Sequence, residues 1–199
     1  MVTKTQPIDK LMGVYNCGHK IFGENKVQEL VDKYEILPKD IEWHLIGHLQ
    51  TNKVKFIAPF VSLIHSVDSL KLLQEINKQA EKNQRIINCL LQIYIAEEET
   101  KFGLNFQEAE ELLVSEELKA LKNIKITGFM GMATNTEHTR KISSEFESLK
   151  LFFDRQKNVQ HFNVNLVNLS MGMSSDYISA IKNGSNMIRV GSSIFGERA

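Results

Sequence analysis

Residues 166–176 read Leu-Val-Asn-Leu-Ser-Met-Gly-Met-Ser-Ser-Asp, and residues 187–196 read Met-Ile-Arg-Val-Gly-Ser-Ser-Ile-Phe-Gly. In each segment a short apolar strand, predicted at 166–169 and at 187–190, leads into a turn of Gly and Ser that opens a predicted helix. Such turns expose backbone N–H groups and hydroxyls, and a helix N-terminus adds unpaired donors and partial positive charge. Two such turns side by side predict a phosphate-binding site.

Short apolar or β-branched runs alternate with stretches of helical periodicity along the rest of the chain. Besides the two segments above, strands are predicted at 20–22, 42–46, 63–67, 87–95 and 124–129. Helix faces are predicted from Leu70, Leu73, Ile76 and Ala80 and from Phe146, Leu149 and Phe153. Asn105 and Glu108 have the spacing of a capping box at a helix start. The pattern is a repeated βα unit, which predicts a parallel sheet.

A parallel sheet of this kind is either open and doubly wound or closed into a barrel. If Val2-Thr3-Lys4 ends a further strand, the count reaches eight, and the phosphate turns follow strands seven and eight, where such barrels usually bind phosphate. We therefore predict one TIM (β/α)8 barrel domain over residues 1–199. Little chain precedes Lys4, so we expect most of the first strand to be absent and residues 1–6 to be displaced, unless a partner chain or the remaining N-terminal residues cover the opening.

Composition excludes several classes of partner. The chain has 199 residues, of which 42% are hydrophobic and 24% charged, and its 24 basic residues balance 24 acidic ones. A net charge of zero gives no drive toward nucleic acid or an anionic membrane. Cys17 and Cys89 lack paired spacing, and no apolar run reaches the length of a membrane span or a signal peptide. We expect a cytoplasmic protein in which both cysteines are buried small hydrophobes.

Side chains at the carboxyl ends of barrel strands meet at one mouth. The predicted set there is Lys4, Glu24, Asn25, His44, Gly47, His65, Gln92, Met130, Met132, Ser170 and Arg189. A lysine beside a phosphate grip suits a Schiff base with a phosphorylated aldehyde, because burial lowers the pKa of the amine and the phosphate anchors its partner. His44 and His48 lie four residues apart, but the strand pattern separates them, and we predict no metal site.

Five blocks of the chain resemble the successive signature blocks of the YggS/PROSC family of pyridoxal 5′-phosphate (PLP) binding and homeostasis proteins. They are residues 2–7, 22–29, 42–53, 169–176 and 189–196. The resemblance implies a PLP-binding barrel related to the N-terminal domain of alanine racemase, mostly monomeric, with a role in vitamin B6 and amino-acid homeostasis and no established reaction. Family members begin with a helix and a complete first strand, so this chain is expected to be N-terminally truncated relative to them.

The resemblance also implies roles for individual residues. Lys4 is similar to the lysine that forms the internal aldimine with PLP, and Asn25 to the asparagine near the cofactor ring or its hydroxyl. Arg189 would face the pyridine nitrogen, where a guanidinium donates and leaves that nitrogen unprotonated, which weakens PLP as an electron sink. The remaining implied contacts are Ser170, Ser174, Gly191 and Ser192 at the phosphate and Ile46 and Met171 at the ring.

Three functions remain open at this point. A PLP carrier, passing the cofactor to transient apoenzyme partners, needs Lys4 and the phosphate grip but no catalytic residue, and we prefer it. An amino-acid racemase needs a second base, and the tyrosines Tyr15, Tyr34, Tyr94 and Tyr177 are not predicted at strand ends. A phosphosugar aldolase or isomerase working through a Schiff base would need a carboxylate beside the lysine, for which Glu24 is the candidate.

Overall fold

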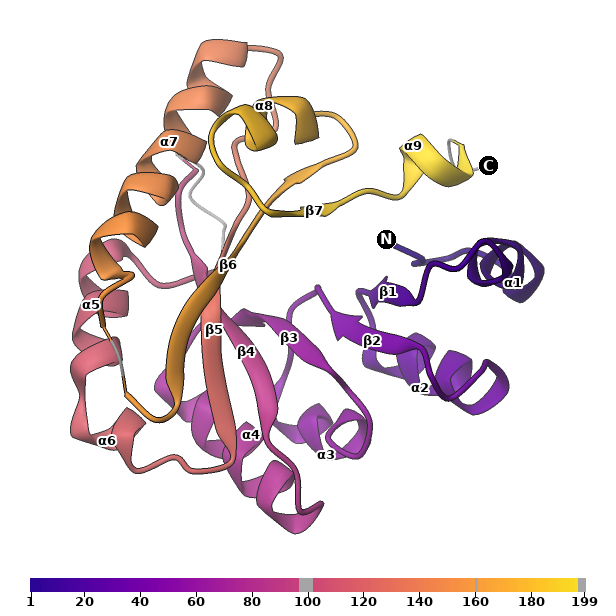
Figure 1. The fold of residues 1–199 in the computed structure, drawn as a ribbon, viewed down its shortest axis with the longest axis horizontal. Coiled ribbons are helices and arrows are strands. Elements are labelled where there is room, and N and C mark those ends of the chain that lie inside the picture. The colour runs from indigo at the N-terminus through magenta and orange to yellow at the C-terminus, as the bar shows by residue number, and fades with distance from the viewer. Residues whose placement is uncertain (97–101, 160, 197–199) are drawn as a thin grey trace.

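A computed structural model describes the chain except for residues 97–101, 160 and 197–199, and it contains a nearly closed parallel barrel (Figure 1). Its seven-stranded sheet follows the order of the sequence. The strands are β1 (Ile21–Glu24), β2 (Glu42–Leu45), β3 (Leu63–Val67), β4 (Ile87–Ile93), β5 (Ile124–Gly131), β6 (Val164–Met173) and β7 (Met187–Arg189). Each predicted strand is confirmed. The main difference is β6, which continues through residues 170–173, where the sequence suggested a turn.

Residues 1–3 lie between the first and last strands of the sheet. Val2 forms a parallel bridge with Gly23 of β1, and its N–H donates to the carbonyl of Val190, just after β7, at 2.7 Å. The N–H of Thr3 donates to the carbonyl of Gly23 at 2.9 Å, and Thr3 is fully buried. These residues occupy the place of the additional strand predicted at Val2–Lys4, which would bring the count to eight. They cover the opening, so they are not displaced.

Helices follow the strands along the chain and lie on the outside of the sheet (Figure 1). They are α1 (Ile8–Asn16), α2 (Val27–Ile36), η1 (Thr51–Lys53), α3 (Val54–Ile57), α4 (Leu70–Lys82), α5 (Phe106–Val114), α6 (Glu116–Lys119), α7 (Thr139–Gln156), α8 (Tyr177–Lys182) and α9 (Ser192–Phe195). The predicted capping box is present at the start of α5, where Asn105 and Glu108 each accept from the other's backbone N–H. None of the described helices is long and apolar enough to cross a membrane.

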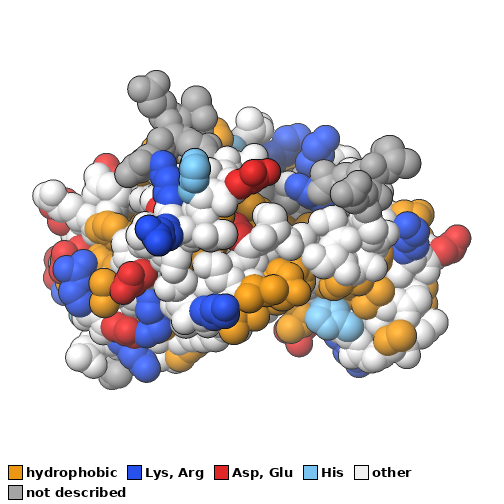
Figure 2. Space-filling model, turned by 90° about the horizontal axis from the view of Figure 1, so that it is seen from above, with side chains coloured by type: hydrophobic (Ala, Val, Ile, Leu, Met, Phe, Trp, Pro, Cys, Tyr) orange, Lys and Arg blue, Asp and Glu red, His pale blue; other side chains and the backbone are white. Residues whose placement is uncertain are grey.

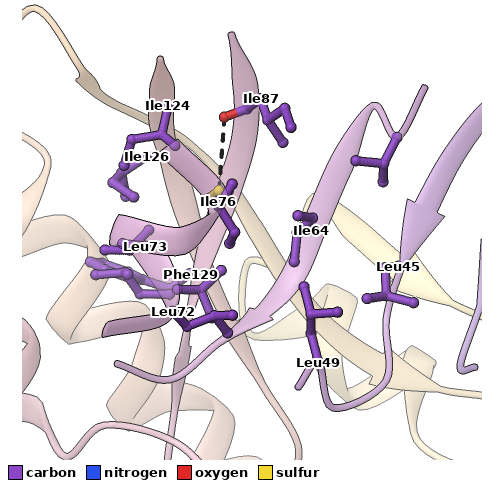
Figure 3. Close-up of a cluster of buried hydrophobic side chains, with 14 of the residues drawn as sticks. Leu45, Leu49, Ile64, Leu72, Leu73, Ile76, Ile87, Ile124, Ile126 and Phe129 are labelled. Carbon is purple, nitrogen blue, oxygen red and sulfur yellow. Dashed lines mark hydrogen bonds between the residues drawn. The ribbon is translucent and has the colours of Figure 1, made fainter. Parts of the chain in front are cut away.

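The main hydrophobic core lies between the helices and the outer face of the sheet. Leu72, Leu73 and Ile76 of α4 pack toward isoleucines of the strands (Figure 3). Full burial of each such side chain contributes roughly 1.5–3 kcal/mol to stability.

A smaller, separate cluster of buried side chains consists of Leu63, Leu90 and Met130. It is separate from the main core because side chains alternate between the two faces of a strand. The predicted helix faces are confirmed except at Leu70, which is half-buried.

The two cysteines differ in environment. Cys89 is buried in the core, its thiol donates toward the carbonyl of Ile87, and burial raises its pKa (Figure 3). Cys17 is exposed at the end of α1, so the expectation that both are buried is wrong for Cys17. The surface in Figure 2 carries acidic and basic side chains intermixed, in keeping with the zero net charge.

Candidate functional site

A cavity of about 490 Å³ lies where the strands end, at the mouth of the barrel. Its lining comes from both ends of the described chain and from the loops after β1, β2, β6 and β7. Of the cofactor residues predicted from the sequence, it brings together Lys4, Asn25, Ile46, Ser174, Arg189, Gly191 and Ser192. It does not bring Ser170 and Met171 into the lining.

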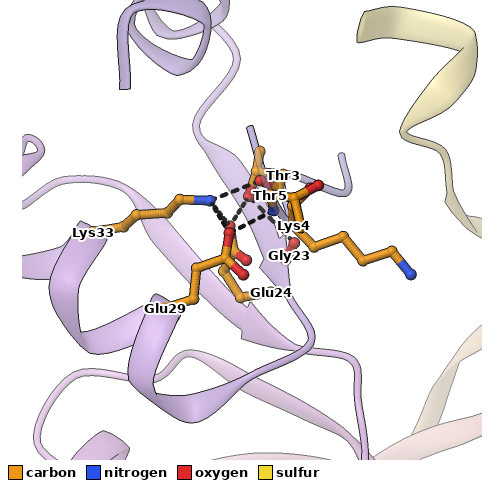
Figure 4. Close-up of polar contacts among 7 residues, drawn as sticks. All are labelled: Thr3, Lys4, Thr5, Gly23, Glu24, Glu29 and Lys33. Atoms are coloured by element: carbon orange, nitrogen blue, oxygen red, sulfur yellow. Dashed lines mark hydrogen bonds and ion pairs between the residues drawn. The ribbon is translucent and has the colours of Figure 1, made fainter. Parts of the chain in front are cut away.

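Lys4 is held by its two neighbours in the chain. The hydroxyl of Thr3 donates to Glu24 Oε1 at 2.5 Å and to the carbonyl of Gly23 at 3.2 Å. The N–H of Thr5 donates to Glu29 Oε1 at 2.5 Å, and Thr5 adopts the left-handed region, with φ 61°. The backbone on both sides of Lys4 is thereby fixed. Its side chain extends away from these contacts, and Lys4 lines the cavity (Figure 4).

A second lysine, Lys33 of α2, is buried and points its amine toward this segment from the side opposite the Lys4 side chain (Figure 4). Its Nζ donates to the Thr3 carbonyl, to Glu24 Oε1 and to Glu29 Oε1, each at 2.7 Å. Burial raises the pKa of the Glu24 carboxyl, while hydrogen bonds from Lys33 and Thr3 oppose that rise. Each of the three N–H groups of the Lys33 ammonium therefore has an acceptor. Glu24 belongs to this buried cluster and not to the cavity lining, contrary to its predicted place at the mouth.

Arg189, at the end of β7, is a buried cation at the base of the cavity. Its Nη1 donates to the carbonyl and to the hydroxyl of Ser170, both at 2.8 Å, and its Nη2 donates to the carbonyl of Gly131 at 2.9 Å. All three acceptors are uncharged. Burial lowers the pKa of Arg189 to about 10, so the guanidinium stays protonated at neutral pH. A buried cation with neutral partners favours an electron-rich ligand beside it.

The sequence predicts Ser170 at the phosphate, but the structure places its side chain elsewhere. Ser170 is fully buried in β6, and its hydroxyl contacts Arg189 and, at 3.1 Å, His65 Nδ1. His65 Nε2 lies 3.0 Å from His44 Nδ1. Met171, the next residue of β6, points to the opposite face and packs in the main core. The sequence of residues 170–172 is typical of a turn, in which neither side-chain orientation is fixed, whereas the strand fixes both.

The two Gly/Ser turns are joined to each other. Ser174 Oγ accepts from the N–H of Gly191 at 3.1 Å and from the N–H of Ser193 at 3.5 Å. A Cβ on Gly191 would lie 3.1 Å from the Val2 carbonyl, which shows how closely the second turn approaches the N-terminal segment. The turns therefore lie side by side as predicted, with the first beginning at Ser174.

Gly47 sets the position of Asn25. A Cβ added at Gly47 would lie 2.3 Å from the carbonyl oxygen of Asn25 and 2.8 Å from its Cα. Only glycine allows the loops after β1 and β2 to approach this closely. Gly47 and Asn25 both line the cavity, so the contact fixes one of its walls.

The cavity rim includes residues to which the sequence analysis gave no binding role. His48 stacks on Phe102 with ring centroids 4.3 Å apart, and its Nδ1 lies 3.4 Å from Asp68 Oδ2. Gln92 donates to the carbonyl of Phe102 at 2.7 Å. Gln92 was expected at a strand end, but the loop that carries Phe102 gave no pattern that would place it here. No tyrosine lines the cavity within the part of the chain that the structure describes.

Comparison with known sequences identifies relatives over nearly the whole chain. The sequence model for the N-terminal domain of alanine racemase matches residues 8–199. A pyridoxal phosphate homeostasis protein of Aquifex aeolicus is 41% identical over 197 residues, which cover 98% of this chain and 85% of that protein.

Solved structures show the same fold. PipY of Synechococcus elongatus PCC7942, determined without PLP, has a TM-score of 0.90 at 33% identity, covering 98% of this chain and 90% of that chain. A structure of PipY with PLP bound has a TM-score of 0.86 at 32% identity and the same coverage. An alanine racemase of Clostridium difficile has a TM-score of 0.77 at 15% identity and covers 99% of this chain but 51% of its own, a likeness of fold alone.

Proposed function

The chain belongs to the family of pyridoxal phosphate homeostasis proteins, and we propose that it binds PLP covalently through Lys4 and serves as a PLP carrier. One observation supports this most strongly. A single cavity of about 490 Å³ combines the Lys4 side chain, the buried Arg189 cation and the joined Gly/Ser turns. PLP has a matching feature for each, namely an aldehyde, a pyridine nitrogen and a phosphate.

The residues of the cavity fit this cofactor. Lys4 supplies the amine that condenses with the aldehyde, and its fixed backbone limits where that amine can reach. The turns at Ser174 and Gly191–Ser192 supply donors for the phosphate, and Asn25 and Ile46 line the cavity between the lysine and the turns. When bound, PLP supplies an electron sink for bonds at an amino-acid carbon.

The contacts of Arg189 support storage of the cofactor rather than carbanion chemistry. The guanidinium is held by Ser170 and Gly131 and can only donate, so a pyridine nitrogen facing it would stay unprotonated. An unprotonated ring is the weaker electron sink. We propose that the protein catalyses no reaction of its own.

The two alternatives have less support. An aldolase or isomerase would need a carboxylate at the lysine, but Glu24 is buried against Lys33 and Thr3. A racemase would need a second base, and the relatives are named as homeostasis proteins. Apart from Lys4 and Arg189, His48 is the titratable group that lines the cavity within the described residues. Incubation of the PLP-loaded protein with L-alanine in deuterium oxide tests the racemase alternative. We expect no exchange of the Cα hydrogen.

The finer parts of the proposal concern partners and place. We propose a cytoplasmic monomer with one cofactor-binding domain, which passes PLP to apoenzymes through transient contacts. The balance of 24 basic and 24 acidic residues supports a role without nucleic acid or anionic membranes. Mixing the loaded protein with an apoenzyme that requires PLP tests the transfer, with recovery of enzyme activity as the readout.

The decisive test is covalent labelling. The protein is loaded with PLP, reduced with borohydride and mapped by peptide mass spectrometry. We expect a visible absorption band that disappears on reduction and a pyridoxyl group on Lys4. The Lys4→Ala variant should lose the label, whereas Lys53→Ala, at an exposed lysine of η1, should keep it. A label on Lys53, Lys26 or Lys33 in the unaltered protein would contradict the assignment.

A further inference from the structure

Four buried side chains from four strands form a continuous chain of hydrogen bonds inside the barrel. It runs from Arg189 of β7 through Ser170 of β6 and His65 of β3 to His44 of β2. The side chains are at most 8% exposed, and the successive distances are 2.8, 3.1 and 3.0 Å. Of these four residues, only Arg189 has a role in the PLP binding proposed above.

The direction of this chain depends on the Ser170 hydroxyl, which has one proton to donate and two lone pairs that accept. A guanidinium has donors and no acceptor, so the Ser170 hydroxyl accepts from Arg189 Nη1. In the described part of the chain, the acceptor within reach of the Ser170 proton is His65 Nδ1. If Ser170 donates its proton to Nδ1, a neutral His65 carries its own proton on Nε2 and donates it to His44 Nδ1. Each imidazole is thereby a neutral Nε2–H tautomer.

The surroundings of the two imidazoles also keep them neutral. Burial lowers the pKa of His44 to about 4 and places the pKa of His65 well below its ordinary value. After burial, the neighbouring His44 and the Arg189 guanidinium also lower the pKa of His65. With both histidines neutral, the positive charge of this network is the one on Arg189, and it is this charge that attracts an electron-rich ligand.

We propose that His65 and His44 are positioning residues that fix the Ser170 hydroxyl as an acceptor and so hold the Arg189 guanidinium in one orientation toward the cavity. The role of that orientation in binding the cofactor rests on the function proposed above. The order of the hydrogen bonds does not rest on it, because it concerns the protein atoms alone. The two parts can therefore be tested separately.

The first test uses the protein without any cofactor. Two-dimensional ¹H–¹⁵N spectra that correlate imidazole nitrogens with ring protons distinguish the two neutral tautomers and the charged form. We expect His44 and His65 both to be neutral Nε2–H tautomers at pH 7. A proton on Nδ1 of His65, or a charged imidazole at either position, would overturn the proposed order.

The second test measures PLP affinity by fluorescence titration in three variants. His65→Asn keeps an acceptor near the position of Nδ1, whereas His65→Phe removes it at similar size. A second cavity of about 150 Å³ borders both histidines and gives the larger ring room to adjust. We expect Ser170→Ala to weaken binding about tenfold, the loss for one hydrogen bond to a charged group, and His65→Phe to weaken it about fivefold, because it removes a hydrogen bond between neutral groups. His65→Asn should stay within about threefold of the unaltered protein.

Asn163→Ala is the control for loss of a buried polar side chain. Its amide donates to the carbonyls of Leu118 and Leu121, remote from the cavity lining, so the variant should lose stability and keep its PLP affinity. Equal affinity in His65→Phe and the unaltered protein would overturn the positioning role, as would equal losses in His65→Phe and His65→Asn. Failure of the unaltered protein to bind PLP would instead contradict the proposed function, and the spectra without cofactor would still decide the hydrogen-bond order.

Discussion

The N–H of Val2 donates to the carbonyl of Val190 at 2.7 Å and so joins the beginning of the chain to the end of the barrel sheet. Val2 also bridges Gly23 of β1 on its other side. Lys4 follows two residues later, and the second Gly/Ser turn begins directly after Val190 at Gly191. Closure of the barrel and assembly of the lysine and phosphate parts of the site therefore depend on the same short segment.

Replacing Val2 with proline should weaken both properties. Proline has no N–H, so the bond to the partly buried Val190 carbonyl is lost, at a cost of about 0.5–1.5 kcal/mol in the free energy of unfolding. Val2→Ala keeps the N–H and is the matched control. Urea unfolding and PLP titration measure the two effects. Equal stability of the proline and alanine variants would contradict the role given to this hydrogen bond.

The Lys33 cluster should be important for folding. Lys33→Met leaves the Glu24 carboxylate buried without its cation, and we expect a loss of about 3–5 kcal/mol in the free energy of unfolding. The double variant Lys33→Met/Glu24→Gln removes the charge as well and should recover part of that loss. Urea unfolding of the two variants makes the comparison. If the double variant is less stable than Lys33→Met, the loss does not come from an uncompensated charge.

The strands could be predicted from the sequence because a fully buried parallel strand leaves a short apolar run between helical stretches. Leu63–Val67 is such a run, and its bounds were predicted as found. Residues 170–173 were misassigned because Ser and Gly suggested a turn, whereas β6 continues there as a strand. Gly172 is accommodated in that strand at a φ of 99°, close to Ala180 of α8.

The site was predictable in part for a similar reason. Lys4, Asn25 and Arg189 end strands or follow them, so the barrel brings them to one mouth. The buried partners were not predictable, because the sequence does not show which inward side chains meet across the barrel. Ser170 and His65 are 105 residues apart in the chain, and only the closed sheet places them within 3.1 Å.

Gly47→Ala should weaken PLP binding by displacing Asn25. The added Cβ would lie 2.3 Å from the Asn25 carbonyl oxygen, so the loop after β1 must move. Gly13→Ala is the control, because nothing lies within 4 Å of a Cβ at Gly13 in α1. That change should stabilise the helix by about 0.5–1 kcal/mol. We expect PLP titration to show a loss at Gly47 alone, and equal affinity in both variants would remove Asn25 from the site.

The serines of the two turns should each contribute to PLP affinity. Ser174→Ala removes the acceptor that joins the turns, and Ser192→Ala removes a hydroxyl of the cavity lining. For a hydrogen bond to a charged group we expect each change to cost about 1.5–3 kcal/mol of binding free energy. Isothermal titration with PLP measures the cost. Unchanged affinity in both variants would contradict the assignment of these turns to the phosphate.

His44 should make the protein sensitive to acid. Its pKa is about 4 in the folded protein against an ordinary value of 6.5. Below pH 6.5 the unfolded chain therefore takes up a proton that the folded protein refuses, and stability falls as the pH drops toward 4. Complete titration of this one group costs about 3 kcal/mol. The His44→Asn variant lacks the group, so its free energy of unfolding should decline less between pH 7 and pH 4.5, as measured by urea unfolding at each pH. Parallel declines in the two proteins would show that His44 is protonated in the folded state as readily as in the unfolded chain.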